Sequence, residues 1–261
     1  SYGYGCGFSL IKAKKKALSE AWERALLKKH HKQKGAFYGF FSSSNGLAAH
    51  PKIDIARSCA KNEIIERKIF LDAWSNKNGW HHYSPVSTRA KFLSYYITNK
   101  GAHIELYLVR TTTVYSLLVG VLVHQELGMY VDSVLLYPMS SINKQEGQVI
   151  MSLIADVAAG VKSFDSKHEF DLPNIGMPLD HRFFYSKVKN NLIFNEMCGT
   201  TQEEKSCVLL DLSEVESIKE VTFIGPGRLP AVVGCFQSKW ARLSWGKQSI
   251  VGRNPLPHPL V

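Results

Sequence analysis

Two stretches of the sequence repeat the pattern E-x-x-E-R, in which two glutamates are followed by an arginine. Its residues are Glu20, Glu23 and Arg24 in the first stretch and Glu63, Glu66 and Arg67 in the second. Both stretches have a strongly helical pattern, and residues i and i+3 of a helix lie on one face, about one turn apart. Each stretch therefore presents two neighbouring carboxylates with an arginine beside the second.

Paired like charges destabilise an isolated helix, so their repetition indicates a cation held between the two stretches. Four carboxylates on facing helices offer the hard oxygen ligands that Mg²⁺ prefers, and Mg²⁺ often bridges carboxylates to nucleotide phosphates. We therefore predict a magnesium site there. The alternative is two ordinary amphipathic helices with solvated glutamates that pair with lysines.

The helices that must position these side chains are predicted at residues 10–34 and 51–74, and Ser9 is a candidate N-cap of the first. The apolar stripe of the first helix contains Ala17, Leu18, Ala21, Ala25 and Leu26. The apolar residues of the second, which we expect to face mostly the core, are Ile55, Cys59, Ile64, Ile65, Phe70 and Ala73. The connecting residues 35–52 are predicted as a loop in which Asn45-Gly46 forms a turn.

The rest of the chain is predicted to form strands around one more helix. The expected strands are 103–109, 113–123, 130–137, 192–194, 207–210, 220–224 and 231–236, and the expected helix is 145–161. Helices and strands do not alternate strictly, which favours an α+β fold with a largely antiparallel sheet. Because no domain-sized linker interrupts the sequence, we predict a single domain over residues 1–261.

The composition narrows the class of protein. The chain has 261 residues, is 45% hydrophobic and carries a formal charge of +10, so it can form a core and favours acidic partners. Five scattered cysteines without a C-x-x-C pair argue against a zinc site or a disulfide framework. His81 and His82, expected in a loop, are adjacent and so do not face one metal. With no signal peptide and no long apolar run, we expect a cytoplasmic protein that does not span a membrane.

The C-terminus carries a second informative pattern. Pro255, Pro257 and Pro259 form P-x-P-x-P, which ends two residues before Val261. Alternating prolines form a stiff, polyproline-like rod. Such a rod could deliver the terminal carboxylate to a fixed place. The alternative is a solvated tail or a ligand for a proline-binding domain.

Together, the two E-x-x-E-R helices, the intervening Ser44-Asn45-Gly46 and the proline pattern resemble the YcaO family, whose members use ATP to modify peptide backbone amides. The resemblance is densest over residues 3–75 and implies a YcaO-like fold with ATP and Mg²⁺ as cofactors. The ATP-binding residues that it implies are Glu20, Glu23, Arg24, Asn45, Glu63, Glu66 and Arg67. The four glutamates among them would bind Mg²⁺. The general base would be the terminal carboxylate of Val261, positioned by Pro255, Pro257 and Pro259.

The resemblance implies cyclodehydration of a ribosomally made precursor peptide. A Cys, Ser or Thr side chain attacks the preceding backbone carbonyl, ATP phosphorylates the oxyanion, and phosphate leaves as the azoline forms. The implied partners are the precursor peptide, a leader-binding protein and a flavin dehydrogenase that would oxidise azolines. A homodimer or hetero-oligomer is also expected. Nucleic acid is not expected, because no groove-reading motif is present.

The sequence departs from the family pattern at several positions. Cys6 stands in place of a lysine, His50 of a glycine, Ile55 of an acid, Cys59 of a glutamine, and Ser152 of an arginine that precedes an acid, here Asp156. These changes keep two alternatives open. One is a degenerate, non-catalytic subunit that scaffolds a modification complex. The other is a thioamidation or ribosomal-protein-modification factor, which the proline pattern disfavours. Family members usually have residues before the first motif, so a missing N-terminal segment is also expected.

Overall fold

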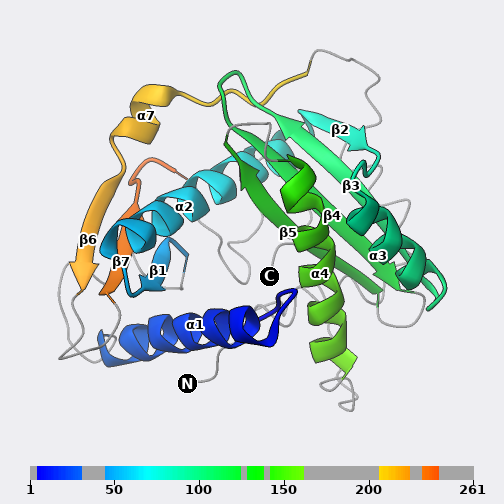
Figure 1. Cartoon of the computed structure of the whole chain (residues 1–261). Helices are drawn as coiled ribbons and strands as arrows, with labels where there is room; N and C mark the ends of the chain where they lie inside the picture. Colours follow the sequence, from blue (N-terminus) through cyan, green and yellow to red (C-terminus); the bar gives the residue numbers. More distant parts are fainter. Residues whose placement is uncertain are drawn as a thin grey trace, which may run out of the picture. The chain divides into compact units, whose positions relative to one another are not determined.

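The computed structural model describes residues 5–30, 45–124, 128–137, 142–161, 206–223 and 231–240 (Figure 1). These residues form two compact units. The first unit contains residues 5–30, 45–68, 211–223 and 231–240. The second contains residues 69–124, 128–137, 142–161 and 206–210. A single domain over residues 1–261 stays a prediction.

The first unit is a small antiparallel sheet with a helix on each face. Its elements are α1 (Leu10–His30), β1 (Leu47–His50), the N-terminal part of α2 (Ile53–Asn76), α7 (Leu212–Glu216), β6 (Lys219–Phe223) and β7 (Ala231–Phe236). The strand order is β1-β7-β6, so β1 is an edge strand. Figure 1 shows this sheet between α1 and α2.

Alternation along the strands explains why both faces are covered. Leu47, Ala49 and Val232 pack against Trp22, Leu26 and Leu27 of α1. The intervening residues Ala48, Val233 and Cys235 pack against Ala56, Ala60 and Ile64 of α2. Successive side chains of a strand point to opposite faces, so each short strand contributes to both layers.

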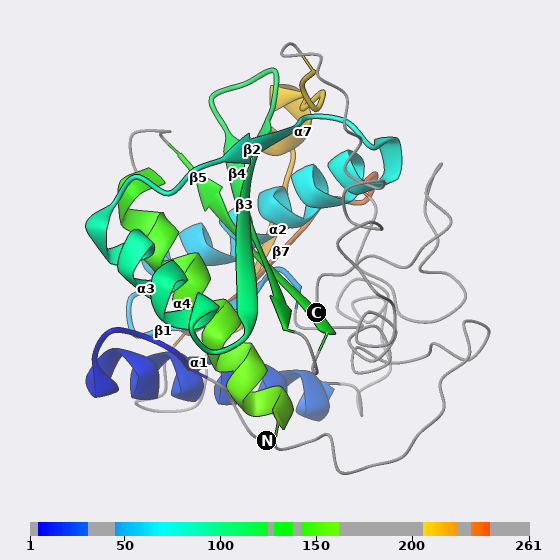
Figure 2. The same ribbon diagram turned by 90° about the vertical axis from the view of Figure 1, so that its right-hand side faces the viewer.

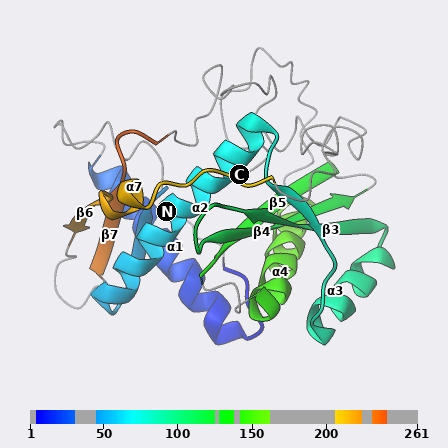
Figure 3. The same cartoon turned by 90° about the horizontal axis from the view of Figure 1, so that it is seen from above.

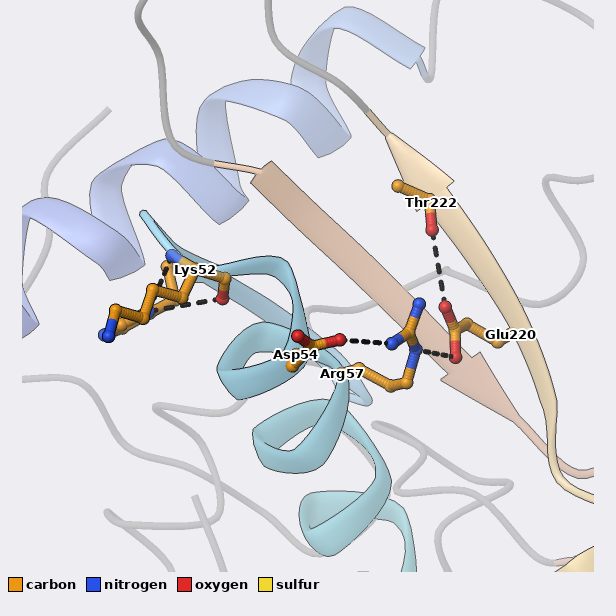
Figure 4. A network of polar contacts seen from close by, with 6 residues as sticks. Lys52, Asp54, Arg57, Glu220 and Thr222 are labelled. Carbon is orange, nitrogen blue, oxygen red and sulfur yellow. Dashed lines mark hydrogen bonds and ion pairs between the residues drawn. The ribbon is translucent and has the colours of Figure 1, made fainter.

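A polar network ties the start of α2 to β6 within the first unit (Figure 4). The Arg57 guanidinium donates to Asp54 at 2.7 Å and to Glu220 at 2.6 Å, and Thr222 donates to Glu220 at 3.4 Å. This network helps to fix α2 against the sheet. It therefore also helps to position the paired-glutamate motif that α2 carries.

The second unit is built on a four-stranded antiparallel sheet of order β2-β3-β4-β5. Its elements are β2 (Trp80–Tyr83), α3 (Thr88–Thr98), β3 (Ala102–Arg110), β4 (Ser116–His124), β5 (Gly128–Leu136) and α4 (Ile142–Val161), with the end of α2. Leu106, Leu118 and Leu122 of the strands form a core with α3 and α4, which lie on the same face of the sheet (Figures 2 and 3).

An aromatic cluster joins the end of α2 to this sheet. The Phe70 ring stacks on Trp74 with centroids 6.1 Å apart and meets Trp80 edge-on at 5.7 Å. Trp80 in turn meets Tyr107 edge-on, and its indole N–H donates to the carbonyl of Ala73.

Most predicted elements are present, with specific corrections. The predicted loop at residues 35–52 contains β1, and the predicted loop around Trp80 is β2. The expected strand at 207–210 is an isolated parallel bridge between Val208 and Thr111. Helices α3 and α7 were not predicted. Predicted residues 31–34, the strand at 192–194 and the loop residues 35–44 lie outside the described residues.

The mixed helices and antiparallel sheets confirm the predicted α+β class. The expectation that Ile55 and Cys59 face the core is wrong, because both residues are exposed on α2. Leu18 of the predicted apolar stripe on α1 is also exposed.

Candidate active site

Both E-x-x-E-R motifs lie in the first unit and converge on one stretch of backbone. Helix α1 carries one motif and α2 the other, and Asn45-Gly46 forms the turn that leads into β1. The backbone N–H of Ala49 donates to Glu23 Oε1 at 2.7 Å. The backbone N–H of Gly46 donates to Glu63 Oε2 at 3.2 Å. One glutamate from each helix therefore binds the 45–49 segment.

Gly46 is fixed by its surroundings as well as by its conformation. It has a positive φ of 75°, and a Cβ at this position would lie 2.4 Å from the carbonyl oxygen of Cys235 and 2.5 Å from Ile64 Cδ1. Its own carbonyl accepts a 2.7 Å hydrogen bond from the N–H of Cys235 on β7. The turn can therefore hold Glu63 and β7 at once only with glycine at this position.

The arginines pair with glutamates of their own helices. Arg24 forms an ion pair with Glu20 at the i,i+4 spacing. Arg67 lies between two carboxylates, with N···O distances of 3.8 Å to Glu63 and 3.8 Å to Glu66. Because these distances exceed hydrogen-bond length, Arg67 balances the charge of both carboxylates without donating to either at short range.

Arg67 retains donor capacity at this site. Its Nε and Nη1 atoms are buried and have no hydrogen-bond partner among the residues that the structure describes. A guanidinium presents several N–H donors in a planar fork that suits phosphate oxygens. The donor set therefore fits an anionic, oxygen-rich ligand such as a nucleotide phosphate.

The pKa values of Glu23 and Glu63 are raised, so their charged forms are disfavoured, and a nearby cation would offset this effect. Burial raises the pKa of Glu23 to about 8, and the nearby charges of Glu63 and Glu20 add to the effect, while the Ala49 N–H and Arg24 oppose it. Burial also raises the pKa of Glu63, opposed by Arg67 and the Gly46 N–H. A divalent cation near these oxygens would favour their charged forms.

The described residues contain no group of three or more His, Cys, Asp or Glu side chains arranged to hold a metal ion. Mg²⁺ commonly binds through one or two carboxylates together with substrate phosphates and water. The carboxylates of α1 and α2 therefore fit a metal that arrives with a nucleotide. The prediction that Glu20, Glu23, Glu63 and Glu66 all contact Mg²⁺ stays a prediction.

Two of the positions that depart from the family pattern, Cys6 and Cys59, are tied to the helices that carry the paired glutamates. Lys16 Nζ lies 3.9 Å from the Cys6 sulfur, so a cation of α1 stands next to the position that lacks a lysine. Cys59 precedes Glu63 by one helical turn. Although Cys59 is exposed as a whole residue, partial burial of its sulfur raises the pKa of the thiol, and the charges of Glu23 and Glu63 raise it further.

His50, which stands where the family pattern has a glycine, forms a hydrogen bond with the backbone just before α2. Its Nδ1 atom accepts a 3.0 Å hydrogen bond from the backbone N–H of Lys52, a residue labelled in Figure 4. This bond orders the chain between β1 and α2, where a glycine would leave the N–H of Lys52 to another partner.

Other predicted site residues lie elsewhere or are not described. Ser152 and Asp156 are half-buried on α4, in the second unit. Ser44, Pro255, Pro257, Pro259 and Val261 lie outside the described residues. The roles of the proline pattern and of the terminal carboxylate therefore remain predictions.

Sequence reasoning missed the main-chain donors at this site. It did not foresee that the N–H groups of Gly46 and Ala49 bind Glu63 and Glu23. The Asn45-Gly46 turn signal was visible, but the partners of its backbone depend on contacts distant in sequence. The proximity of Cys59 to the acids could have been inferred from its i,i+4 spacing to Glu63.

A family model described as YcaO cyclodehydratase, ATP- and Mg²⁺-binding, matches residues 24–133. Among solved structures, YcaO from Methanopyrus kandleri bound with AMPPCP and Mg²⁺ has a TM-score of 0.61 at 13% identity, over 91% of this chain and 78% of that chain. No curated protein sequence matches the chain.

Two further structures share the fold. The E. coli microcin synthetase McbBCD complex with pro-MccB17 bound gives a TM-score of 0.55 at 10% identity, over 76% of this chain and 55% of that chain. A heterocyclase in complex with substrate and cofactor gives 0.55 at 12% identity, over 77% of this chain and 28% of that chain. This chain thus spans about a quarter to a half of the length of these two relatives.

The family match and the fold together confirm the predicted resemblance to the YcaO family. The predicted cofactors, ATP and Mg²⁺, agree with the description of the family model and with the ligands of the Methanopyrus kandleri structure. Among the helices in the described part of the chain, none has the length and apolar character needed to cross a membrane.

Proposed function

We propose that this chain binds ATP and Mg²⁺ at the E-x-x-E-R helices and uses them to activate backbone amides of a peptide. The observation that carries the proposal is the convergence of Glu23 and Glu63 on the 45–49 segment, beside the available donors of Arg67. Carboxylates for a metal and a guanidinium for phosphate thus occur at one site, as an ATP-dependent enzyme requires.

The proposed reaction is cyclodehydration of Cys, Ser or Thr in a ribosomally made precursor peptide to azolines. Bound Mg·ATP would supply the phosphoryl group that turns an amide oxygen into a leaving group. Arg67 would hold phosphate oxygens, Asn45 would contact the nucleotide, and Glu20, Glu23, Glu63 and Glu66 would supply metal ligands. Arg24 would balance the charge of Glu20, with which it forms an ion pair. The carboxylate of Val261 would accept protons from the attacking side chain and the amide.

The partners follow from the same proposal. The solved E. coli relative is a complex with pro-MccB17 bound, which supports a peptide substrate and partner proteins for this chain. A leader-binding protein and a flavin dehydrogenase are part of the proposal, as are a homodimeric or hetero-oligomeric state and a cytoplasmic location. A single YcaO-like domain over residues 1–261 also belongs to it.

A non-catalytic scaffold subunit is the second candidate. Three observations favour it: Cys6 removes a cation, and the exposed Ile55 and Cys59 replace polar residues on the face of α2 that carries Glu63. A nucleotide would meet less polar surface there, so the scaffold would bind ATP weakly or turn it over slowly.

Calorimetric titration of Mg·ATP into the full chain tests the proposal. The site variant is Glu63→Gln/Glu66→Gln, which removes two negative charges and keeps the shape of the side chains. The matched control is Glu216→Gln, at an exposed position at the end of α7. We expect saturable binding to the native and control chains, and at least about tenfold weaker binding to the site variant.

A second measurement separates the two candidates. Phosphate release from ATP that depends on an added Cys-rich precursor peptide and its leader-binding protein would support the enzyme. Saturable binding without such turnover would support the scaffold. Equal binding of Mg·ATP by the native chain and the site variant would show that the nucleotide does not bind at Glu63 and Glu66. That result would contradict the nucleotide site proposed for the enzyme and for the scaffold.

A further inference from the structure

We propose that the outer face of α3 is a docking surface for an acidic segment of a partner protein. This outer face consists of Phe92, Tyr95 and Tyr96. It lies in the second unit and involves none of the residues assigned to ATP, so the inference stands independently of the proposed nucleotide site.

Helix α3 is apolar on two faces. Ala90, Leu93 and Ile97 are buried against the sheet and α4. The outer-face residues Phe92, Tyr95 and Tyr96 are 66%, 69% and 50% exposed, respectively. Single exposed apolar residues are common, but three aromatic side chains at the i, i+3 and i+4 positions of one helix form a contiguous patch. Such patches mark interaction sites.

The helix that carries this patch is held rigidly. Ser87 caps its N-terminus, with Oγ accepting from the N–H of Ala90 at 3.2 Å. The buried carboxylate of Glu146 on α4 accepts from the N–H groups of Val86 at 3.1 Å and Ser87 at 2.8 Å. A surface fixed in this way loses little conformational freedom on binding, which favours affinity.

The charge around the patch indicates the kind of partner. Residues 84–101 contain Arg89, Lys91 and Lys100 and no Asp or Glu. On α3, Arg89 stands three residues before Phe92 and Lys91 four residues before Tyr95, while Lys100 follows directly after the C-cap residue Asn99. Positive side chains that flank an apolar stripe complement a segment with aliphatic anchors and flanking acids.

The arrangement favours a polypeptide over nucleic acid. Proteins that bind single strands combine a positively charged groove with aromatic platforms for successive bases. Here the aromatic residues follow the i, i+3, i+4 spacing of a single helix, which matches the spacing by which one helix docks an apolar face of another. We therefore assign the surface to an acidic, amphipathic protein segment.

Selection from a random displayed peptide library against the full chain tests this assignment. The face variant is Phe92→Ser/Tyr95→Ser/Tyr96→Ser, and the charge variant is Lys91→Glu/Lys100→Glu. The matched control is Val114→Ser/Leu209→Ser, which removes two exposed apolar side chains of the same unit. Circular dichroism establishes that each variant keeps its secondary structure, as expected for changes at exposed positions.

We expect enriched peptides that combine aliphatic residues with Asp or Glu. Their affinity, measured by fluorescence anisotropy, should fall at least about tenfold with the face variant and with the charge variant, and should be unchanged with the control. Enrichment of basic peptides, or of none that require the outer face, would overturn the proposal. So would tighter binding of single-stranded oligo-dT than of any peptide, if lost in the face variant.

Discussion

The carboxylate of Glu23 on α1 accepts a 2.7 Å hydrogen bond from the backbone N–H of Ala49 on β1. Strand β1 lies at the edge of the β1-β7-β6 sheet, so this bond ties a side chain of the candidate active site to the open edge of the sheet. An edge N–H that would otherwise require water is satisfied by a residue proposed to act in catalysis.

Glu23 should make stability depend on pH. Its pKa rises from an ordinary value of 4.5 to about 8, chiefly through burial, so the folded chain holds this proton more tightly than the unfolded chain. The contribution of Glu23 to stability is therefore fully present below about pH 4.5 and is lost as pH rises through about 8. Urea denaturation across this range should show a falling midpoint.

Glu23→Gln should reduce this pH dependence, because the amide oxygen still accepts from Ala49 but cannot ionise. Glu63, whose pKa is also raised, will leave a residual slope of the same sign. An unchanged slope in Glu23→Gln, with Glu216→Gln as the reference variant, would show that Glu23 does not titrate in this range.

Gly46→Ala should destabilise the first unit strongly. A Cβ at Gly46 would meet Ile64 and the carbonyl of Cys235, and its φ is positive. We expect a loss of about 3 kcal/mol in the free energy of unfolding, from backbone strain and overpacking together. Gly101→Ala is the matched control, because Gly101 also has a positive φ but nothing lies within 4 Å of its added Cβ.

The control should cost about 1 kcal/mol, from backbone strain alone. Chemical denaturation followed by circular dichroism measures both variants. Similar losses for Gly46→Ala and Gly101→Ala would show that the close contacts of Gly46 do not limit its replacement.

Glu146→Ala should destabilise the second unit and loosen the start of α3. The carboxylate accepts from the Tyr83 hydroxyl at 2.5 Å and from the two N–H groups that precede α3, so its removal leaves these donors without their acceptor. We expect a loss of about 3 kcal/mol for Glu146→Ala and about 1.5 kcal/mol for Tyr83→Phe. Hydrogen exchange should increase at Ala90 and Lys91 in Glu146→Ala.

Cys59 should report the charge at the candidate active site. Burial raises the pKa of its thiol, and Glu23 and Glu63 raise it further, so neutralising these acids should increase its thiolate fraction. Above the pKa of about 8 of Glu23, where this acid is ionised, we expect iodoacetamide to alkylate Cys59 about threefold faster in Glu23→Gln/Glu63→Gln than in the native chain. Cys207, in the second unit, provides the internal reference in the same mass-spectrometric time course.

If Cys59 and Cys207 show unchanged rates in the double variant, the carboxylates do not act on the thiol. A parallel increase at both cysteines would instead indicate general loosening of the fold.

Elements with a clear periodic pattern could be predicted from the sequence, and elements held by distant contacts could not. The strand at 231–236 was predicted with the bounds that β7 has, because its apolar residues cluster between turn signals. Strand β1 contains two alanines and no β-branched residue, and its strand form depends on pairing with β7. Tertiary contacts override local preference in such a segment.

Helix α3 was missed for a different reason. Its outer face is as apolar as its buried face, so no single stripe stands out at the helical period. Ile55 and Cys59 were wrongly predicted to face the core for a related reason. An apolar residue that is exposed on a helix has the same sequence pattern as a residue of the core.

The sequence predicted the two helices that carry the paired glutamates but not the contacts that these glutamates make. The repeated spacing of Glu20, Glu23, Glu63 and Glu66 identified the two helices. The bond of Glu63 with Gly46 spans 17 positions of sequence, and the bond of Glu23 with Ala49 spans 26. No local sequence pattern encodes contacts between residues so far apart.

Glu23 and Glu63 combine a proposed role in metal binding with a structural role in holding the 45–49 segment. This combination affects how related chains would evolve. Because each holds an N–H group that orders the 45–49 segment, selection for a folded chain alone would preserve them after activity had been lost. The survival of these two acids is therefore a poor indicator of turnover.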